Sequence, residues 1–99
     1  MAIEVTAFRA LDKGTLRGFL SIRMTNIGME IHDATLHEKN GRRWIGLPSK
    51  SYQKADGSQG WAPLVSFYDR GMETRFRDAT LKALERFQHR GGGDEREPF

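Results

Sequence analysis

The feature that most constrains the fold is a change in the spacing of apolar residues near residue 69. Before it, apolar residues recur at every second position, most clearly from Leu16 to Met24, as expected for strands that bury one face. After it, they recur every three to four positions, as on one face of an amphipathic helix. The sequence therefore predicts an α+β fold: a twisted antiparallel β-sheet of about five strands with one long C-terminal helix.

Turn residues divide the first two thirds of the chain into strands. We predict strands at residues 3–8, 16–24, 29–37, 42–47 and 61–68. Asn40-Gly41 is the strongest turn signal, because both residues tolerate the positive φ of a type I′ turn. The alternation changes phase between Ile31 and Ala34, and a β-bulge near His32-Asp33 would restore it. Residues 48–60 show no alternation and are expected to form a surface loop.

The helix is expected to begin after Asp69, whose side chain can cap it, and to end near Arg90-Gly91. Its apolar stripe comprises Met72, Phe76, Ala79, Thr80, Ala83, Leu84 and Phe87. We predict a single domain over residues 1–90 and a disordered acidic tail over residues 91–99.

Composition narrows the classes of function. The chain has 99 residues, no cysteine, and 16 Lys and Arg against 13 acidic residues, for a net charge of +3. Without cysteine, disulfides and thiolate metal sites are excluded. No apolar run approaches the roughly 18 residues of a membrane span, and the N-terminus lacks a signal-peptide pattern, so we expect a cytoplasmic protein without membrane contact. The weak positive charge permits anionic partners without requiring them.

Patterns for catalysis and metal binding are weak. His32 and His37 lie in one expected strand at a separation that does not bring two imidazoles onto one ion. No Ser/His/acid arrangement stands out, and the glycines at 91–93 follow the expected helix, whereas a phosphate-binding loop precedes one. We therefore expect no enzymatic activity, no cofactor and no metal ion.

Two arginines flank an aromatic residue on the polar face of the second expected strand. Arg17 and Arg23 share that face with Phe19, and an exposed ring between arginines is a common means of stacking bases and holding phosphates. The same pattern is explained if this face contacts a partner subunit. It is also explained if Phe19 lies under the helix while the other face is open.

Further cations gather at the Asn-Gly turn and in the expected loop. The candidates there are Lys39, Arg42, Arg43, Lys50 and Lys54, with Tyr52 as a residue that could stack on a base. Phosphate contacts need charge more than fixed geometry, which suits a basic loop beside a basic hairpin. Taken one at a time, each of these residues is explained equally well as part of an ordinary solvent-exposed surface. Trp44 and Trp61 are expected to anchor the core or an interface, because large aromatic residues in strands usually bury area.

Several short motifs, taken in order, resemble a known family. They are His32-Asp33-Ala34-Thr35-Leu36, Asn40-Gly41, Trp44-Ile45-Gly46-Leu47-Pro48-Ser49-Lys50 and Asp56-Gly57. Over roughly residues 3–88 the chain resembles SpoVG, the bacterial septation and sporulation regulators. The resemblance implies a small β-rich dimer that binds DNA, or in some cases RNA, to regulate gene expression. It also implies that Lys50 and the basic residues of the loop and helix contact the nucleic acid.

Three functions follow from these patterns. We expect a regulatory nucleic-acid-binding homodimer whose partner is DNA or RNA, with phosphates contacted by a basic sheet face, a hairpin and a loop. One alternative is a protein that binds single-stranded nucleic acid without sequence preference; another is a protein–protein interaction module that does not bind nucleic acid. The predicted contact residues are Arg17, Phe19, Arg23, Arg42, Arg43, Lys50, Tyr52 and Lys54.

Overall fold

The computed structural model describes residues 2–90, which form six β-strands and one α-helix. The strands are β1 (Ile3–Lys13), β2 (Leu16–Met24), β3 (Met29–Lys39), β4 (Arg42–Gly46), β5 (Ser49–Gln53) and β6 (Gln59–Pro63), and the helix is α1 (Arg70–His89). The predicted α+β class, with an antiparallel sheet and one C-terminal helix, is confirmed. The predicted tail at 91–99 lies outside the described residues.

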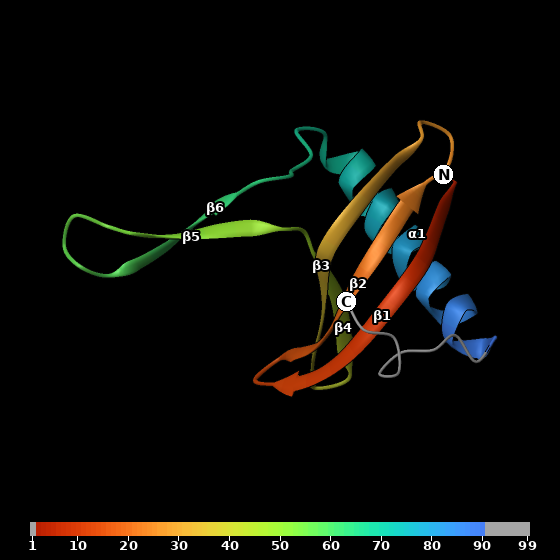
Figure 1. Cartoon of the computed structure of the whole chain (residues 1–99), viewed down its shortest axis with the longest axis horizontal. Coiled ribbons are helices and arrows are strands. Elements are labelled where there is room, and N and C mark those ends of the chain that lie inside the picture. The colour runs from red at the N-terminus through yellow and green to blue at the C-terminus, as the bar shows by residue number, and fades with distance from the viewer. Residues whose placement is uncertain (1, 91–99) are drawn as a thin grey trace.

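Strands β1 to β4 form one antiparallel sheet in which neighbours in sequence are neighbours in space (Figure 1). The phase change in β3 is a bulge: Leu20 pairs with Ala34 while Ile22 pairs with Ile31, so three steps along β3 match two along β2. Asp33, inside this bulge, has a φ of 62°. The bulge predicted at this place is confirmed.

The first strand is longer than predicted. It continues to Lys13, and its pairing with β2 shifts register between Val5 and Ala7 and again between Ala10 and Lys13. Each shift places an extra residue on β1, which breaks the alternation from which the shorter strand was predicted. The turn between β3 and β4 follows the prediction, because Asn40 and Gly41 have φ values of 54° and 80°.

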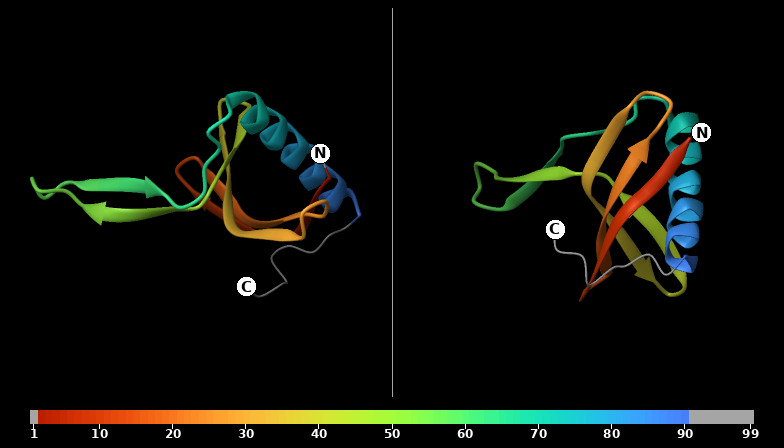
Figure 2. Two further views of the ribbon diagram at one scale, coloured as in Figure 1. Left: turned by 90° about the horizontal axis from the view of Figure 1, so that it is seen from above. Right: turned by 45° about the vertical axis from the view of Figure 1, so that its right-hand side comes forward.

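Strands β5 and β6 pair with each other and form a separate two-stranded hairpin, here called the arm (residues 49–63). The arm projects away from the main sheet (Figures 1 and 2). Its base is closed by the Leu64 N–H, which donates to the Pro48 carbonyl oxygen at 3.0 Å, and its tip by the Lys54 N–H, which donates to the Ser58 carbonyl oxygen at 2.7 Å. The predicted loop at 48–60 is therefore wrong, and the predicted fifth strand at 61–68 is correct only over residues 61–63, because β6 ends at Pro63.

The helix lies across one face of the four-stranded sheet and buries the core against it (Figure 2). The sheet contributes Ile3, Val5, Phe8, Leu20, Ile22, Ile31, Ala34, Leu36 and Ile45 to this core. From α1, the side chains of Phe76, Thr80, Ala83 and Leu84 are buried, as the predicted stripe requires. Full burial of a side chain such as Leu84 stabilises the fold by roughly 1.5–3 kcal/mol.

Polar contacts stabilise the start of the helix and attach the helix to the sheet. At its start, the Asp69 carboxylate accepts a hydrogen bond from the Met72 N–H at 3.2 Å, which confirms the predicted cap. Farther along, Arg77 pairs with Glu73 at 2.6 Å and donates to the carbonyl oxygen of Ile45, which ties α1 to β4. Within residues 2–90, no helix is long and apolar enough to cross a membrane.

Candidate nucleic-acid interface

The face of the main sheet away from α1 is here called the open face. It carries Phe19 and most of the sheet residues that were predicted to contact nucleic acid together with Phe19. Directly paired residues on adjacent strands point to the same side of a sheet. Arg9, Phe19 and Thr35 are paired in this way across β1, β2 and β3, and His37 and Trp44 across β3 and β4. Since the helix packs on the alternate residues, the interpretation that Phe19 lies under the helix is wrong.

The arginine that stacks on Phe19 is one that sequence reasoning missed. The guanidinium carbon of Arg9 lies 5.4 Å from the centroid of the Phe19 ring, within the range of a cation–π interaction. Arg9 lies in the part of β1 beyond Phe8, which was not predicted to be a strand. A correct prediction of the register between β1 and β2 would have identified Arg9, because Arg9 is the direct cross-strand partner of Phe19.

Arg17 and Arg23 lie near the two ends of β2 and each already has an acidic partner. Arg17 Nη1 donates to Asp12 Oδ1 at 3.0 Å and to the Gly14 carbonyl oxygen at 2.8 Å, so it braces the turn between β1 and β2. Arg23 Nη2 donates to Glu30 Oε2 at 3.0 Å. Exposed ion pairs of this kind contribute only about 0–1 kcal/mol, so a phosphate group could replace the carboxylate at little cost.

His37 and Trp44 form a stacked pair on the open face. Their rings are stacked, with centroids 5.5 Å apart and planes inclined by 10°. His37 Nδ1 and Nε2 lie 3.0 Å from the hydroxyl oxygens of Thr15 and Thr35 respectively, so both ring nitrogens have partners. Desolvation by burial lowers the pKa of His37 below its ordinary value, because burial disfavours the charged ring. His37 is therefore neutral at physiological pH.

The two arginines after the Asn-Gly turn point to opposite faces. Arg42 pairs with Lys39, two residues from the paired His37 and Trp44, and so belongs to the open face. Arg43 pairs with Glu38 on the side of the helix. The structure thus brings Arg42 together with Lys39, while Arg43 stands apart from the predicted group.

The arm has two chemically different faces. Lys50, Tyr52 and Lys54 lie on one of them, here called the cationic face. On that face Tyr52 lies across β6 at Gly60, where a Cβ atom would approach Tyr52 Cζ to 2.7 Å and Lys54 Cε to 2.9 Å. The opposite face, here called the uncharged face, comprises Ser49, Ser51, Gln53, Gln59, Trp61 and Pro63.

A groove of about 640 Å³ lies between the open face and the base of the arm. Its lining residues are Leu16, Phe19, His32, Asp33, Thr35, His37, Leu47, Pro48, Ser49, Trp61 and Leu64. Trp61 and Leu64 are 63% and 65% exposed, so the groove leaves two large apolar side chains in water. Neither Trp61 nor Trp44 belongs to the core, so of the two expected roles, anchor of the core or anchor of an interface, the first is wrong for both and the second stays a prediction.

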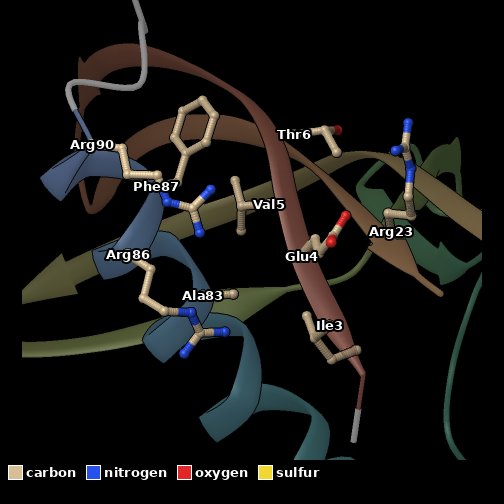
Figure 3. A pocket seen from close by; sticks show the side chains of 9 residues that line it. All are labelled: Ile3, Glu4, Val5, Thr6, Arg23, Ala83, Arg86, Phe87 and Arg90. Atoms are coloured by element: carbon tan, nitrogen blue, oxygen red, sulfur yellow. The ribbon is translucent and has the colours of Figure 1, made fainter. Parts of the chain in front are cut away.

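A second pocket, of about 400 Å³, lies beside β1 at the C-terminal half of α1. Figure 3 shows Arg86 and Arg90 projecting from α1 toward β1, while Glu4 and Arg23 lie on the other side of that strand. The helix cations therefore approach the sheet from its covered side and do not extend the open face.

Neither a metal centre nor a known family emerges from these features. Within the described residues 2–90, no three His, Cys, Asp or Glu side chains are grouped so that they could hold a metal ion. Comparison of the chain with protein-family models, curated proteins and solved structures finds no match.

Proposed function

We propose that this protein binds nucleic acid through the cationic face of its arm and the open face of its sheet, and that it acts as a SpoVG-like regulator. The observation that carries the proposal is the arrangement of Lys50, Tyr52 and Lys54 on one face of a projecting two-stranded ribbon. A two-stranded β-ribbon has dimensions that fit the major groove of B-DNA. Lysines on such a ribbon neutralise phosphates without needing a fixed geometry.

The open face supplies the second set of contacts. Arg9 and Phe19 offer a cation beside an aromatic ring, and Lys39 with Arg42 offers a pair of like charges that a phosphate between them would relieve. Arg17 and Arg23 add charge at the ends of β2 once their acidic partners are exchanged for phosphate. Affinity in this mechanism is mainly electrostatic. It falls as the salt concentration rises, because salt cations compete with the protein for the phosphates.

Single-stranded nucleic acid without sequence preference is the second candidate. It is supported by the aromatic side chains of the open face, Phe19 and the stacked His37–Trp44 pair, since unpaired bases stack on such rings. A protein-interaction module is the third candidate, supported by the exposed Trp61 and Leu64. The three candidates differ in their ligand, so one binding experiment separates them.

That experiment is fluorescence anisotropy with labelled double-stranded DNA, single-stranded DNA and RNA. The proposal predicts micromolar or tighter binding at low salt. A preference for duplex DNA favours insertion of the arm into a groove, whereas a preference for single strands favours stacking on the open face. Absence of binding to all three at low salt would refute both nucleic-acid candidates and leave a protein partner.

A matched pair of variants tests whether the arm contacts the nucleic acid. Lys50→Gln with Lys54→Gln should weaken binding, because it removes both cations of the cationic face. The control is Lys13→Gln with Lys82→Gln, which removes the same charge from exposed positions on β1 and α1. Equal losses in the two variants would show that net charge alone matters, and would count against the arm.

A further inference from the structure

We infer that the pocket between β1 and the C-terminal half of α1 binds an acidic, extended segment of a partner protein, which adds to the sheet as a strand beside β1. The pocket has a volume of about 400 Å³, and its lining includes residues 3–6 of β1 and Ala83, Arg86, Phe87 and Arg90 of α1. Of the predicted nucleic-acid contacts, only Arg23 lines it. The inference therefore stands or falls independently of nucleic-acid binding.

Strand β1 is an edge of the main sheet and leaves one row of backbone groups without a neighbouring strand. Among the described residues 2–90, β2 is the one strand that pairs with it. Over residues 3–5 this pairing is regular, and the first register shift follows between Val5 and Ala7. An open edge of this kind is a template on which an extended chain can pair. The pocket lies beside the regular stretch, so the added strand is expected to pair there.

Two arginines of α1 give the pocket a preference for acidic ligands. Arg86 and Arg90 project from α1 toward β1 (Figure 3). Both are exposed, and within the described residues neither side chain has an ion pair or a hydrogen bond. The helix dipole favours cations at this end of α1, but it does not determine the side of the helix on which they lie. Because they lie one helical turn apart, the two cations repel each other, and an anionic group between them removes that repulsion.

The spacing of these arginines is comparable to that of alternate residues in a strand. Arg86 and Arg90 are separated by about 6 Å along the helix axis, and alternate residues of a strand by about 6.6 Å. Two acidic residues at alternate positions of the added strand can therefore pair with both arginines. The intervening side chains point to the other side of β1, where Glu4 lies, so they should not be acidic. The expected ligand is a strand with acidic residues at every second position.

The pocket is better suited to a polypeptide of another protein than to a nucleic acid or a second copy. A polypeptide both donates and accepts hydrogen bonds along the edge of β1, whereas phosphate oxygens only accept them. Apolar lining from Ile3, Val5 and Phe87 also suits side chains better than phosphates. A second copy that paired through its own β1 would bring its own Arg86 and Arg90 to the same contact, and each copy carries a net charge of +3.

The test is a titration of the isotope-labelled full chain, followed by the NMR shifts of its backbone amides. The probe is a short, acetylated and amidated peptide in which Thr and Glu alternate, and the control peptide has the same composition with all Glu residues preceding all Thr residues. We expect the alternating peptide to bind more tightly and to shift the amides of residues 3–6 and 83–90. Shifts confined to the arm and the open face, or equal affinities for the two peptides, would overturn the inference.

A matched pair of variants tests the role of the two arginines. Arg86→Gln with Arg90→Gln should weaken binding of the alternating peptide about 10-fold, because each exposed ion pair changes an affinity by up to about fivefold. The control is Arg70→Gln with Arg75→Gln, which removes the same charge from exposed positions of α1 outside the pocket. The control variant should bind the peptide as the wild type does. Equal losses in the two variants would show that net charge alone attracts the peptide, and would overturn the inference.

N-methylation of the peptide tests the strand pairing itself. Successive amides of a strand point in opposite directions, so methyl groups at the odd or at the even positions remove the N–H groups of one edge only. One of the two methylated peptides should lose binding while the other retains it, and equal affinities for the two would overturn strand addition. If duplex DNA shifts the amides of residues 83–90 and the peptide does not, the two arginines belong to a nucleic-acid surface and the inference is overturned.

Discussion

The pairing of β1 with β2 places Arg9 over Phe19, and Gly18→Ala tests whether that pairing is as tight as the structure indicates. A Cβ atom at Gly18 would lie 2.6 Å and 2.7 Å from ring atoms of Phe8 and 2.7 Å from the carbonyl oxygen of Arg9. Phe8 is 6% exposed and packed in the core, and the carbonyl oxygen belongs to the backbone of β1. Neither neighbour can move away without shifting the strand.

The expected cost follows from two opposing effects. Overpacking of a filled site usually destabilises a protein by about 1–3 kcal/mol. Replacing Gly by Ala also restricts the unfolded chain, which returns about 0.4–1 kcal/mol. Gly18→Ala should therefore lower the free energy of unfolding by roughly 1–2 kcal/mol.

Gly71→Ala is the matched control. Gly71 is exposed near the start of α1, and its added Cβ would meet only Asp69 Oδ1, at 3.3 Å. Alanine is favoured over glycine in a helix, so this change should stabilise the protein by up to about 1 kcal/mol. Urea denaturation followed by circular dichroism measures both variants. If Gly18→Ala is neutral or stabilising, the close packing of β1 on β2 is refuted.

Two further predictions concern His37 and Arg77. Because burial lowers the pKa of folded His37 below 6.5, the unfolded chain takes up the proton first as pH falls, and stability should decline as pH drops below about 6.5. Urea midpoints measured across that range should decline less in His37→Gln; an equal decline would contradict the assignment. Arg77→Met should cost about 1.5–3 kcal/mol, because it removes a charged donor from the Ile45 carbonyl oxygen. Arg75→Met, at an exposed position of the same helix, should change stability by less than about 0.5 kcal/mol, and equal costs would show that Arg77 does not tie the helix to β4.

The main sheet and the helix could be predicted because each buries one face. Along β2 the apolar residues Leu20 and Ile22 occupy alternate positions and are fully buried. The bulge in β3 is visible in the sequence as a change of phase between Ile31 and Ala34. The helix stripe repeats at the helical period, and Asp69 marked its start. In each case, burial of one side of the element produces a periodic pattern of apolar residues in the sequence.

The sequence of the arm has no such periodic pattern of apolar residues. Both faces of β5 are exposed, so polar residues such as Ser51 and Gln53 occupy positions that alternation cannot distinguish from a loop. Arg9 was missed for a related reason, since the register shifts in β1 erase its alternation. That Arg42 and Arg43 lie on opposite faces could have been predicted from the sequence, because adjacent residues in a strand point to opposite faces.

The most direct test of the nucleic-acid proposal is the salt dependence of binding to duplex DNA. The slope of log K against log salt concentration should be negative, and each lysine that contacts a phosphate contributes about 0.9 to its magnitude. Lys50→Gln with Lys54→Gln should therefore reduce that magnitude by about 1.8 for a single bound chain. A wild-type slope near zero, or an unchanged slope in the double variant, would contradict phosphate binding by the arm.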